Sequence, residues 1–287
     1  MRGTLDVVAE PLISNVSDTA RWVATYRAME SARPDALFRD HLADRLAGER
    51  GRAIVAAAPR MLGNGWWLVA RTKVIDDAIM AAIGEGCDRV LNLAAGLDTR
   101  PYRLPLPPDF TWVEADLPGL LTEKERMLSD ETPRCRLTRR AVDLADPVAR
   151  EQFLTEVLHG ASRTLVLTEG LLMYLEERDV RALSEAFTRP EVAWWLVDFV
   201  GPGLARRLNK RSGGLMDSAP VRFAPANGVA FFEELGWRAL ELESVLTAGR
   251  RFRRLPPFLR LAARLPQADP RNPGRHIYSA IVRLARA

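Results

Sequence analysis

The chain has 287 residues, 47% hydrophobic and 27% charged, which is typical of a globular protein and long enough for one large domain with appendages. Its net charge of +4 rests on 41 basic residues, only three of them lysines, and because the arginines are spread along the whole chain we expect no nucleic-acid partner. No apolar run reaches the roughly 18 residues of a membrane span, residues 1–15 lack a signal-peptide pattern, and Cys87 and Cys135 form no disulfide framework, so we expect a cytoplasmic protein without a membrane anchor.

Hydrophobic periodicity predicts a helical start followed by alternating strands and helices. Residues 17–50 are predicted to be helical, and a second helix begins at Arg71 and ends near Gly84. The strands are predicted at 89–94, 111–115, 137–142, 163–168, 192–199, 237–243 and 277–282, and the main helices between them at 118–129, 147–158 and 176–188. Short apolar strands separated by helices of this length indicate a doubly wound α/β fold with a mostly parallel sheet.

Residues 201–226 interrupt this alternation with several glycines and prolines, and they predict either a loose loop or a lid over a substrate pocket. A helix is predicted to end within 231–237. No internal repeat or linker is evident. We therefore expect one domain, in which residues 1–70 form a helical cap, 71–200 the core, and 201–287 the lid region and last strands.

The predicted strand at 89–94 ends in small residues, Ala94, Ala95 and Gly96, and a polar cluster follows it. Small residues leave the backbone bare, so a ligand can lie directly against it. In open α/β sheets, ligands bind beyond the carboxyl ends of the strands. This turn is therefore the predicted ligand site.

Acidic residues follow four successive predicted strands at the same edge. Asp98 follows the first, Asp116 closes the second, Asp143 follows the third and Glu169 the fourth. A carboxylate at the end of the second strand can accept hydrogen bonds from both hydroxyls of a ribose. The alternative is that these acids only cap helices.

A carboxylate-rich edge suits a cationic, hydroxyl-rich ligand and disfavours a pyrophosphate. A dinucleotide site needs the pattern G-x-G-x-x-G, whereas Gly96 stands alone here. S-adenosyl-L-methionine (SAM) carries a sulfonium, an ammonium and a ribose but no phosphate, so the residues favour SAM over NAD. His41, His159 and His276 have no partner at ligand spacing, and we expect no metal.

Residues 92–104, NLAAGLDTRPYRL, resemble the signature of the leucine carboxyl methyltransferase family, which includes protein phosphatase carboxyl methyltransferases and bacterial polyketide O-methyltransferases of the tetracenomycin type. Supporting matches are VART at 69–72, EADLP at 114–118, DL at 143–144, TEGLLMYL at 168–175 and, typical of the bacterial branch, YRAMES at 26–31. One departure is Ala94, where many members have glycine, and we expect it to cause only slight crowding.

The resemblance implies a class I SAM-dependent methyltransferase: a Rossmann-like, mostly parallel seven-stranded sheet with helices on both faces and an N-terminal helical cap. It assigns Arg71 to the methionine carboxylate, Glu169 to the ammonium, Asp116 to the ribose, and Asp143 with Leu144 to the adenine. The other predicted cofactor-binding residues are Asn92, Ala94, Ala95, Gly96, Asp98 and Leu117. The expected product is S-adenosyl-L-homocysteine (SAH).

The expected reaction is O-methylation of a small molecule, a polyketide or another natural product, at a carboxylate or phenol. A carboxylate is already ionised at neutral pH, whereas a phenol with a pKa of about 10 usually needs a base. The predicted catalytic residues are Tyr174, facing the reacting groups, Arg27, steering a carboxylate as Arg71 could, and Asp198, a base for a phenol unless its role is structural.

Two alternatives stay open from the sequence. One is an NAD(P)-dependent oxidoreductase, and the other is a non-catalytic SAM-binding protein on the same fold. We expect a monomer or homodimer with a small-molecule acceptor as its partner.

Overall fold

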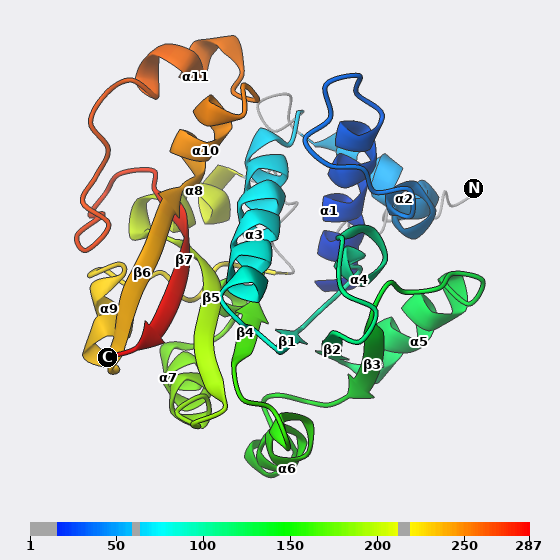
Figure 1. The fold of residues 1–287 in the computed structure, drawn as a ribbon. Coiled ribbons are helices and arrows are strands. Elements are labelled where there is room, and N and C mark those ends of the chain that lie inside the picture. Colours follow the sequence, from blue (N-terminus) through cyan, green and yellow to red (C-terminus); the bar gives the residue numbers. More distant parts are fainter. Residues whose placement is uncertain (1–15, 59–63, 212–218) are drawn as a thin grey trace, which may run out of the picture.

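A seven-stranded sheet organises the chain in the computed structural model, which describes residues 16–58, 64–211 and 219–287 (Figure 1). The strands are β1 (Arg89–Leu93), β2 (Thr111–Asp116), β3 (Arg136–Ala141), β4 (Thr164–Thr168), β5 (Val192–Val200), β6 (Trp237–Ser244) and β7 (Ser279–Arg286). Their order is β3-β2-β1-β4-β5-β7-β6, and β7 pairs antiparallel with both of its neighbours. The other pairs are parallel, so the predicted α/β fold with a mostly parallel sheet is confirmed.

Helices cover both faces of this sheet. They are α1 (Val16–Ser31), α2 (Ala43–Ala57), α3 (Trp66–Gly84), α4 (Arg100–Arg103), α5 (Pro118–Met127), α6 (Pro147–Leu158), α7 (Glu177–Ala186), α8 (Pro202–Arg211), α9 (Ala230–Glu234), α10 (Val245–Arg251) and α11 (Pro257–Ala262), with a 3-10 turn η2 (Leu172–Tyr174). One apolar core joins α3 and α10 to the sheet, and another joins α6, α7 and α9 to the opposite face.

The inner strands alternate their side chains between these two cores. Val90 and Trp112 face the α3 side, whereas Leu91 and Val113 face the α6 side, and all four are buried. Strands buried on both faces need near-continuous apolar runs, which is the pattern that predicts them in the sequence. Because β1 to β5 all run parallel, their carboxyl ends meet at one edge of the sheet.

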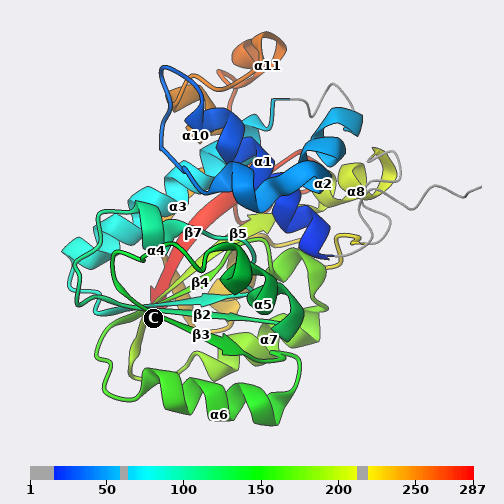
Figure 2. The ribbon, with the colours of Figure 1, turned by 90° about the vertical axis from the view of Figure 1, so that its right-hand side faces the viewer.

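The N-terminal helices α1 and α2 pack against each other and against the chain just beyond this edge (Figures 1 and 2). Ala24 and Leu46 share a hydrophobic cluster with Leu97, which follows β1, and with Leu120 of α5. The prediction that residues 17–50 are helical is wrong between α1 and α2, because residues 32–42 form turns. There the buried Asp40 carboxylate accepts from the backbone N–H of Leu42 and from Arg27.

The region 201–226 contains α8, which its glycines and prolines did not indicate. Residues 212–218 of the predicted lid, and the N-terminal residues 1–15 judged against a signal peptide, lie outside the described residues. Within the described ranges, no helix combines the length and apolar character that crossing a bilayer requires.

Candidate active site

The turn after β1 holds two residues in the left-handed backbone region. Ala94 has φ +52° and Gly96 has φ +50°. Glycine adopts this conformation freely, whereas for an alanine it costs roughly 1–2 kcal/mol. The Gly96 N–H donates to Asp116 Oδ2 over 2.7 Å and so ties the turn to the end of β2. A Cβ at Gly96 would lie 3.5 Å from Ala20 Cβ of α1, so the N-terminal cap lies directly over the turn.

The ends of β2 and β3 present carboxylates beside apolar side chains. Asp116 Oδ1 accepts from the Leu117 N–H over 2.7 Å, and Asp143 Oδ1 accepts from the Ala145 N–H over 2.9 Å, so backbone donors orient both carboxylates. Leu117 is 56% exposed although it is a large apolar residue, and Leu144 is half-buried. Apolar side chains with carboxylates that can accept from hydroxyls and an exocyclic amine are the chemistry that an adenosine moiety needs.

A buried charge cluster joins the ends of β1, β4 and β5 to α3. Arg71 of α3 lies between Glu169, whose Oε1 is 3.0 Å from its Nε, and Asp198, whose Oδ2 is 2.9 Å from its Nη1. Arg100 Nη1 lies 2.7 Å from both Asp98 Oδ2 and Glu169 Oε2. Acids that follow β1 and β4, and one within the last residues of β5, are thus brought together by two guanidinium groups.

The cluster continues toward the N-terminal cap through Asp76, which the sequence patterns did not single out. Arg100 Nε donates to Asp76 Oδ1 over 2.7 Å, and Arg103 Nη1 donates to Asp76 Oδ2 over 2.6 Å. Arg103 also approaches Asp40, which accepts from Arg27 Nε over 2.8 Å. A signal was available, because Asp76 is a buried acid in a mostly apolar helix, and such an acid needs a cationic partner.

With all its groups ionised, the cluster has one more negative charge than positive charges. It comprises four arginines and five acids, namely Arg27, Arg71, Arg100, Arg103, Asp40, Asp76, Asp98, Glu169 and Asp198. SAM has two cationic groups and one carboxylate, hence a net charge of +1. The residues present therefore fit this cofactor in charge.

The carboxyls of the cluster respond differently to burial. Burial would raise the pKa of Asp98, but Arg100 together with Lys124 and Arg103 outweighs it and holds that pKa below its ordinary value. Arg100 with Arg71 does the same for the pKa of Glu169. For Asp198 burial prevails over Arg71 and the Gly170 N–H, so its pKa is raised. Among these three carboxyls, Asp198 is thus the one whose pKa is shifted toward proton uptake.

The remaining predicted site residues lie around this cluster. Asn92 Nδ2 donates to Asp98 Oδ2 over 2.8 Å, so both side chains are occupied within the protein. Arg27 is buried, and its second guanidinium nitrogen donates to the Leu97 carbonyl over 2.6 Å, which suits a residue that positions the turn. Tyr174 packs against the aromatic cluster of α1, and burial raises the pKa of its hydroxyl.

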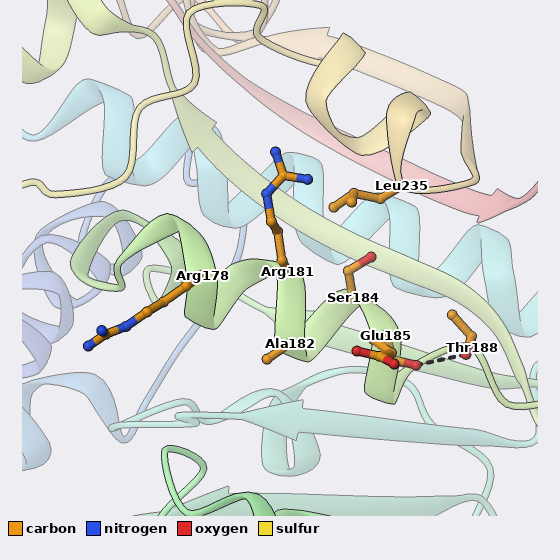
Figure 3. Close-up of a pocket in the computed structure, with 7 residues that line it drawn as sticks. All are labelled: Arg178, Arg181, Ala182, Ser184, Glu185, Thr188 and Leu235. Carbon is orange, nitrogen blue, oxygen red and sulfur yellow. Dashed lines mark hydrogen bonds between the residues drawn. The ribbon is translucent and has the colours of Figure 1, made fainter.

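The hollow drawn in Figure 3 lies on the outer side of α7 and contains none of these residues. It is lined by Arg178, Arg181, Ala182, Ser184, Glu185, Thr188 and Leu235. Nor do the described residues contain a group of three or more side chains that could hold a metal ion.

Comparison with known proteins places this arrangement in a family. The sequence model described as "Leucine carboxyl methyltransferase" matches residues 20–188. A Parafrankia protein named "putative S-adenosyl-L-methionine-dependent methyltransferase" is 31% identical over 85% of this chain and 83% of its own length. A Rhodococcus jostii protein of the same name is 38% identical over 61% of this chain and 62% of its own length.

Two solved structures share the fold. A DUF574 family protein from Streptomyces avermitilis has a TM-score of 0.59 at 14% identity, covering 94% of this chain and 97% of its own. A structure titled a putative methyltransferase from Thermobifida fusca has a TM-score of 0.54 at 17% identity, covering 93% of both chains. The predicted class I methyltransferase fold is confirmed, and so is SAM as the cofactor at the level of the family. The chain belongs to the leucine carboxyl methyltransferase family of SAM-dependent methyltransferases.

Proposed function

We propose that this protein transfers the methyl group of SAM to an oxygen atom, a carboxylate or a phenolic hydroxyl, of a small molecule such as a polyketide or another natural product. The observation that carries this proposal is the pair formed by Arg71 of α3 and Asp198 near the end of β5, with Tyr174 close by in η2. A carboxyl with a raised pKa can take a phenol's proton. The family's name, which refers to carboxyl methylation, points the same way.

In this proposal the cofactor residues divide the ligand among the strand ends. Asp116 holds the ribose, Asp143 with Leu144 and Leu117 flanks the adenine, and the backbone of Ala94, Ala95 and Gly96 lies against the ligand. Arg71 pairs with the methionine carboxylate and Glu169 receives the ammonium. Asn92 and Asp98 act through their bonds to each other and to Arg100, which hold the turn in place. SAM, when bound, supplies a methyl carbon activated by the adjacent sulfonium.

The chain's own residues then align and shield the acceptor. In-line attack mainly requires that the nucleophile, the methyl carbon and the sulfur be held in one line, and the α1–α2 cap covers the turn after β1. We assign Tyr174 to the acceptor's side of the site and Asp198 to proton uptake from a phenol. Arg27, satisfied by Asp40 and the Leu97 carbonyl, is assigned a positioning role instead of the substrate-steering role predicted from the sequence.

The test is a panel of carboxylates, phenols and amines incubated with labelled SAM and the purified protein, with products identified by mass spectrometry. We expect an O-methylated product. An amine product would overturn the choice of oxygen, and SAM binding without any product would favour the non-catalytic alternative. Binding of NADH but not of SAH in calorimetry would support the oxidoreductase, which the family assignment disfavours.

The pH dependence separates the two oxygen acceptors. For a phenol, kcat should fall as the pH drops through the raised pKa of Asp198, and Asp198→Asn should remove that dependence together with most of the activity. For a carboxylate acceptor, kcat should change little above the acceptor's own pKa. Affinity for SAH, measured on the same variant, shows whether the binding site has survived the substitution.

A further inference from the structure

A basic groove on α8 lies outside the site described above. Arg206, Arg207 and Lys210 line a hollow of about 330 Å³ together with Gly203 and Ile277. We call these five residues the α8 groove. Ile277 is 58% exposed, so the groove combines three cations with an accessible apolar side chain.

The cations of the α8 groove differ from most other arginines of this chain in having no acidic partner among the described residues. Several other surface arginines do lie beside acids: Arg45 Nη1 is 2.9 Å from Asp130 Oδ1, and Arg140 Nη2 is 2.8 Å from Glu156 Oε1. Like charges held close together repel each other, and an anionic ligand relieves that repulsion. The groove therefore has the charge of an anion-binding surface.

The wall of the α8 groove is held by close backbone packing. A Cβ at Gly203 would lie 2.1 Å from the His276 carbonyl oxygen and 2.2 Å from that of Arg275, so only glycine permits this contact. The contact fixes the first turn of α8 against residues 275–277, which bring Ile277 into the groove. The arrangement is thus built into the fold and does not depend on the chance positions of long side chains alone.

The groove is connected to the proposed acceptor site on two sides. α8 begins two residues after the end of β5, the strand that carries Asp198. At its other end, Asn209 exchanges hydrogen bonds of 2.9 Å with the backbone N–H and carbonyl of Val221. The next N–H, that of Arg222, donates over 2.8 Å to the carbonyl of Met173, the residue before Tyr174.

We propose that the α8 groove binds an anionic group, a carboxylate or a phosphate, carried by the acceptor at a distance from the oxygen that is methylated. An apolar stretch of the acceptor beside this group contacts Ile277. The acceptor class is thus an amphipathic small molecule with a second anionic end. This assignment of substrate rests on the proposed function, whereas the binding of an anion in the groove does not.

The experiment compares two variants that each lose three positive charges. Arg206→Gln/Arg207→Gln/Lys210→Gln alters the groove. Arg238→Gln/Arg250→Gln/Arg264→Gln is the matched control, because these three arginines are also exposed and have no acidic partner among the described residues. Isothermal titration at low salt uses inorganic pyrophosphate and, separately, succinate as probes. Affinity for SAH is measured on all three proteins.

We expect the wild-type protein and the control to bind at least one probe, and the groove variant to bind it at least about tenfold more weakly, with SAH affinity unchanged throughout. Preference for pyrophosphate assigns a phosphate-bearing acceptor, and preference for succinate a carboxylate-bearing one. The proposal is overturned if the groove variant binds as well as the wild type, if the control loses as much affinity, or if the wild type binds neither probe. Anion binding without O-methylation of any acceptor would count against the proposed function, but the α8 groove would still be an anion-binding site.

Discussion

Arg100→Met removes the charge that holds three buried carboxylates together. The Arg100 side chain is 2% exposed and has nitrogen–oxygen distances of 2.7 Å to Asp76, Asp98 and Glu169. Methionine fills much of the space of the aliphatic stem but leaves these acids without their common partner. Breaking a buried ion pair by removing one partner costs about 3–5 kcal/mol, out of a total unfolding free energy of roughly 5–15 kcal/mol for a typical domain. We expect Arg100→Met to lower the unfolding free energy by about 3–5 kcal/mol near pH 7.

The pH dependence of this loss tests the cause. In the wild type, Arg100 keeps the pKa values of Asp98 and Glu169 low, so their stabilising effect is present above the unfolded-state pKa of about 4 and is lost as the pH falls through the lower folded-state values. In the variant these carboxyls are buried and less compensated, and protonation relieves the cost. The difference in unfolding free energy between the two proteins should therefore be largest near neutral pH and shrink below pH about 4.

The assay is urea unfolding, followed by tryptophan fluorescence, once near pH 7 and once below pH about 4. The matched control is Arg52→Met, whose side chain is 49% exposed and pairs with the exposed Asp44, and it should change stability by less than about 1 kcal/mol. A loss for Arg100→Met no larger than that of the control, or one equal at both pH values, would refute the reasoning.

Three further predictions use single measurements. Asp116→Ala should abolish SAM binding through loss of the ribose contact, and unchanged affinity in SAH calorimetry would contradict the assignment. Ala94→Gly should raise the unfolding free energy by up to about 1 kcal/mol, because relief of the left-handed strain exceeds the added chain entropy; urea unfolding that shows a decrease would argue against strain. Burial raises the pKa of Cys87 to about 11 and that of Cys135 to about 12, so a thiol reagent at pH 8 should react slowly with the native protein and rapidly in guanidinium; fast native reaction would contradict their burial.

The parallel strands could be predicted because burial on both faces leaves a plain signal in the sequence. The runs at 89–94 and 192–199 differ from β1 and β5 by only one residue at an end. Helices α4, α10 and α11 were not predicted, because helices of four to seven residues complete too few turns to show a period. The turns at 32–42 depend on tertiary contacts of Asp40, which periodicity cannot register.

At the site, the sequence placed the acids at the correct edge but could not pair them. Gly96 and Asp116 were both predicted at this edge, and the structure joins them by a hydrogen bond. The roles of Asp76 and Arg100 could not be derived, since their contact spans 24 positions and depends on how α3 lies against the turn. Whether Asp98 meets the cofactor or holds the turn is likewise decided by which donors fill its two oxygens.

The packing of the first helices onto the turn after β1 has a consequence for how this protein can be dissected. Because α1 and α2 share a hydrophobic cluster with Leu97, Tyr102 and Leu120, they are not a detachable module. Removing them would strip apolar cover from the turn after β1. A chimera that takes residues 16–57 from a relative must therefore take the matching contacts at Leu97, Tyr102 and Leu120 as well, so the two parts of the chain are exchangeable only as a set.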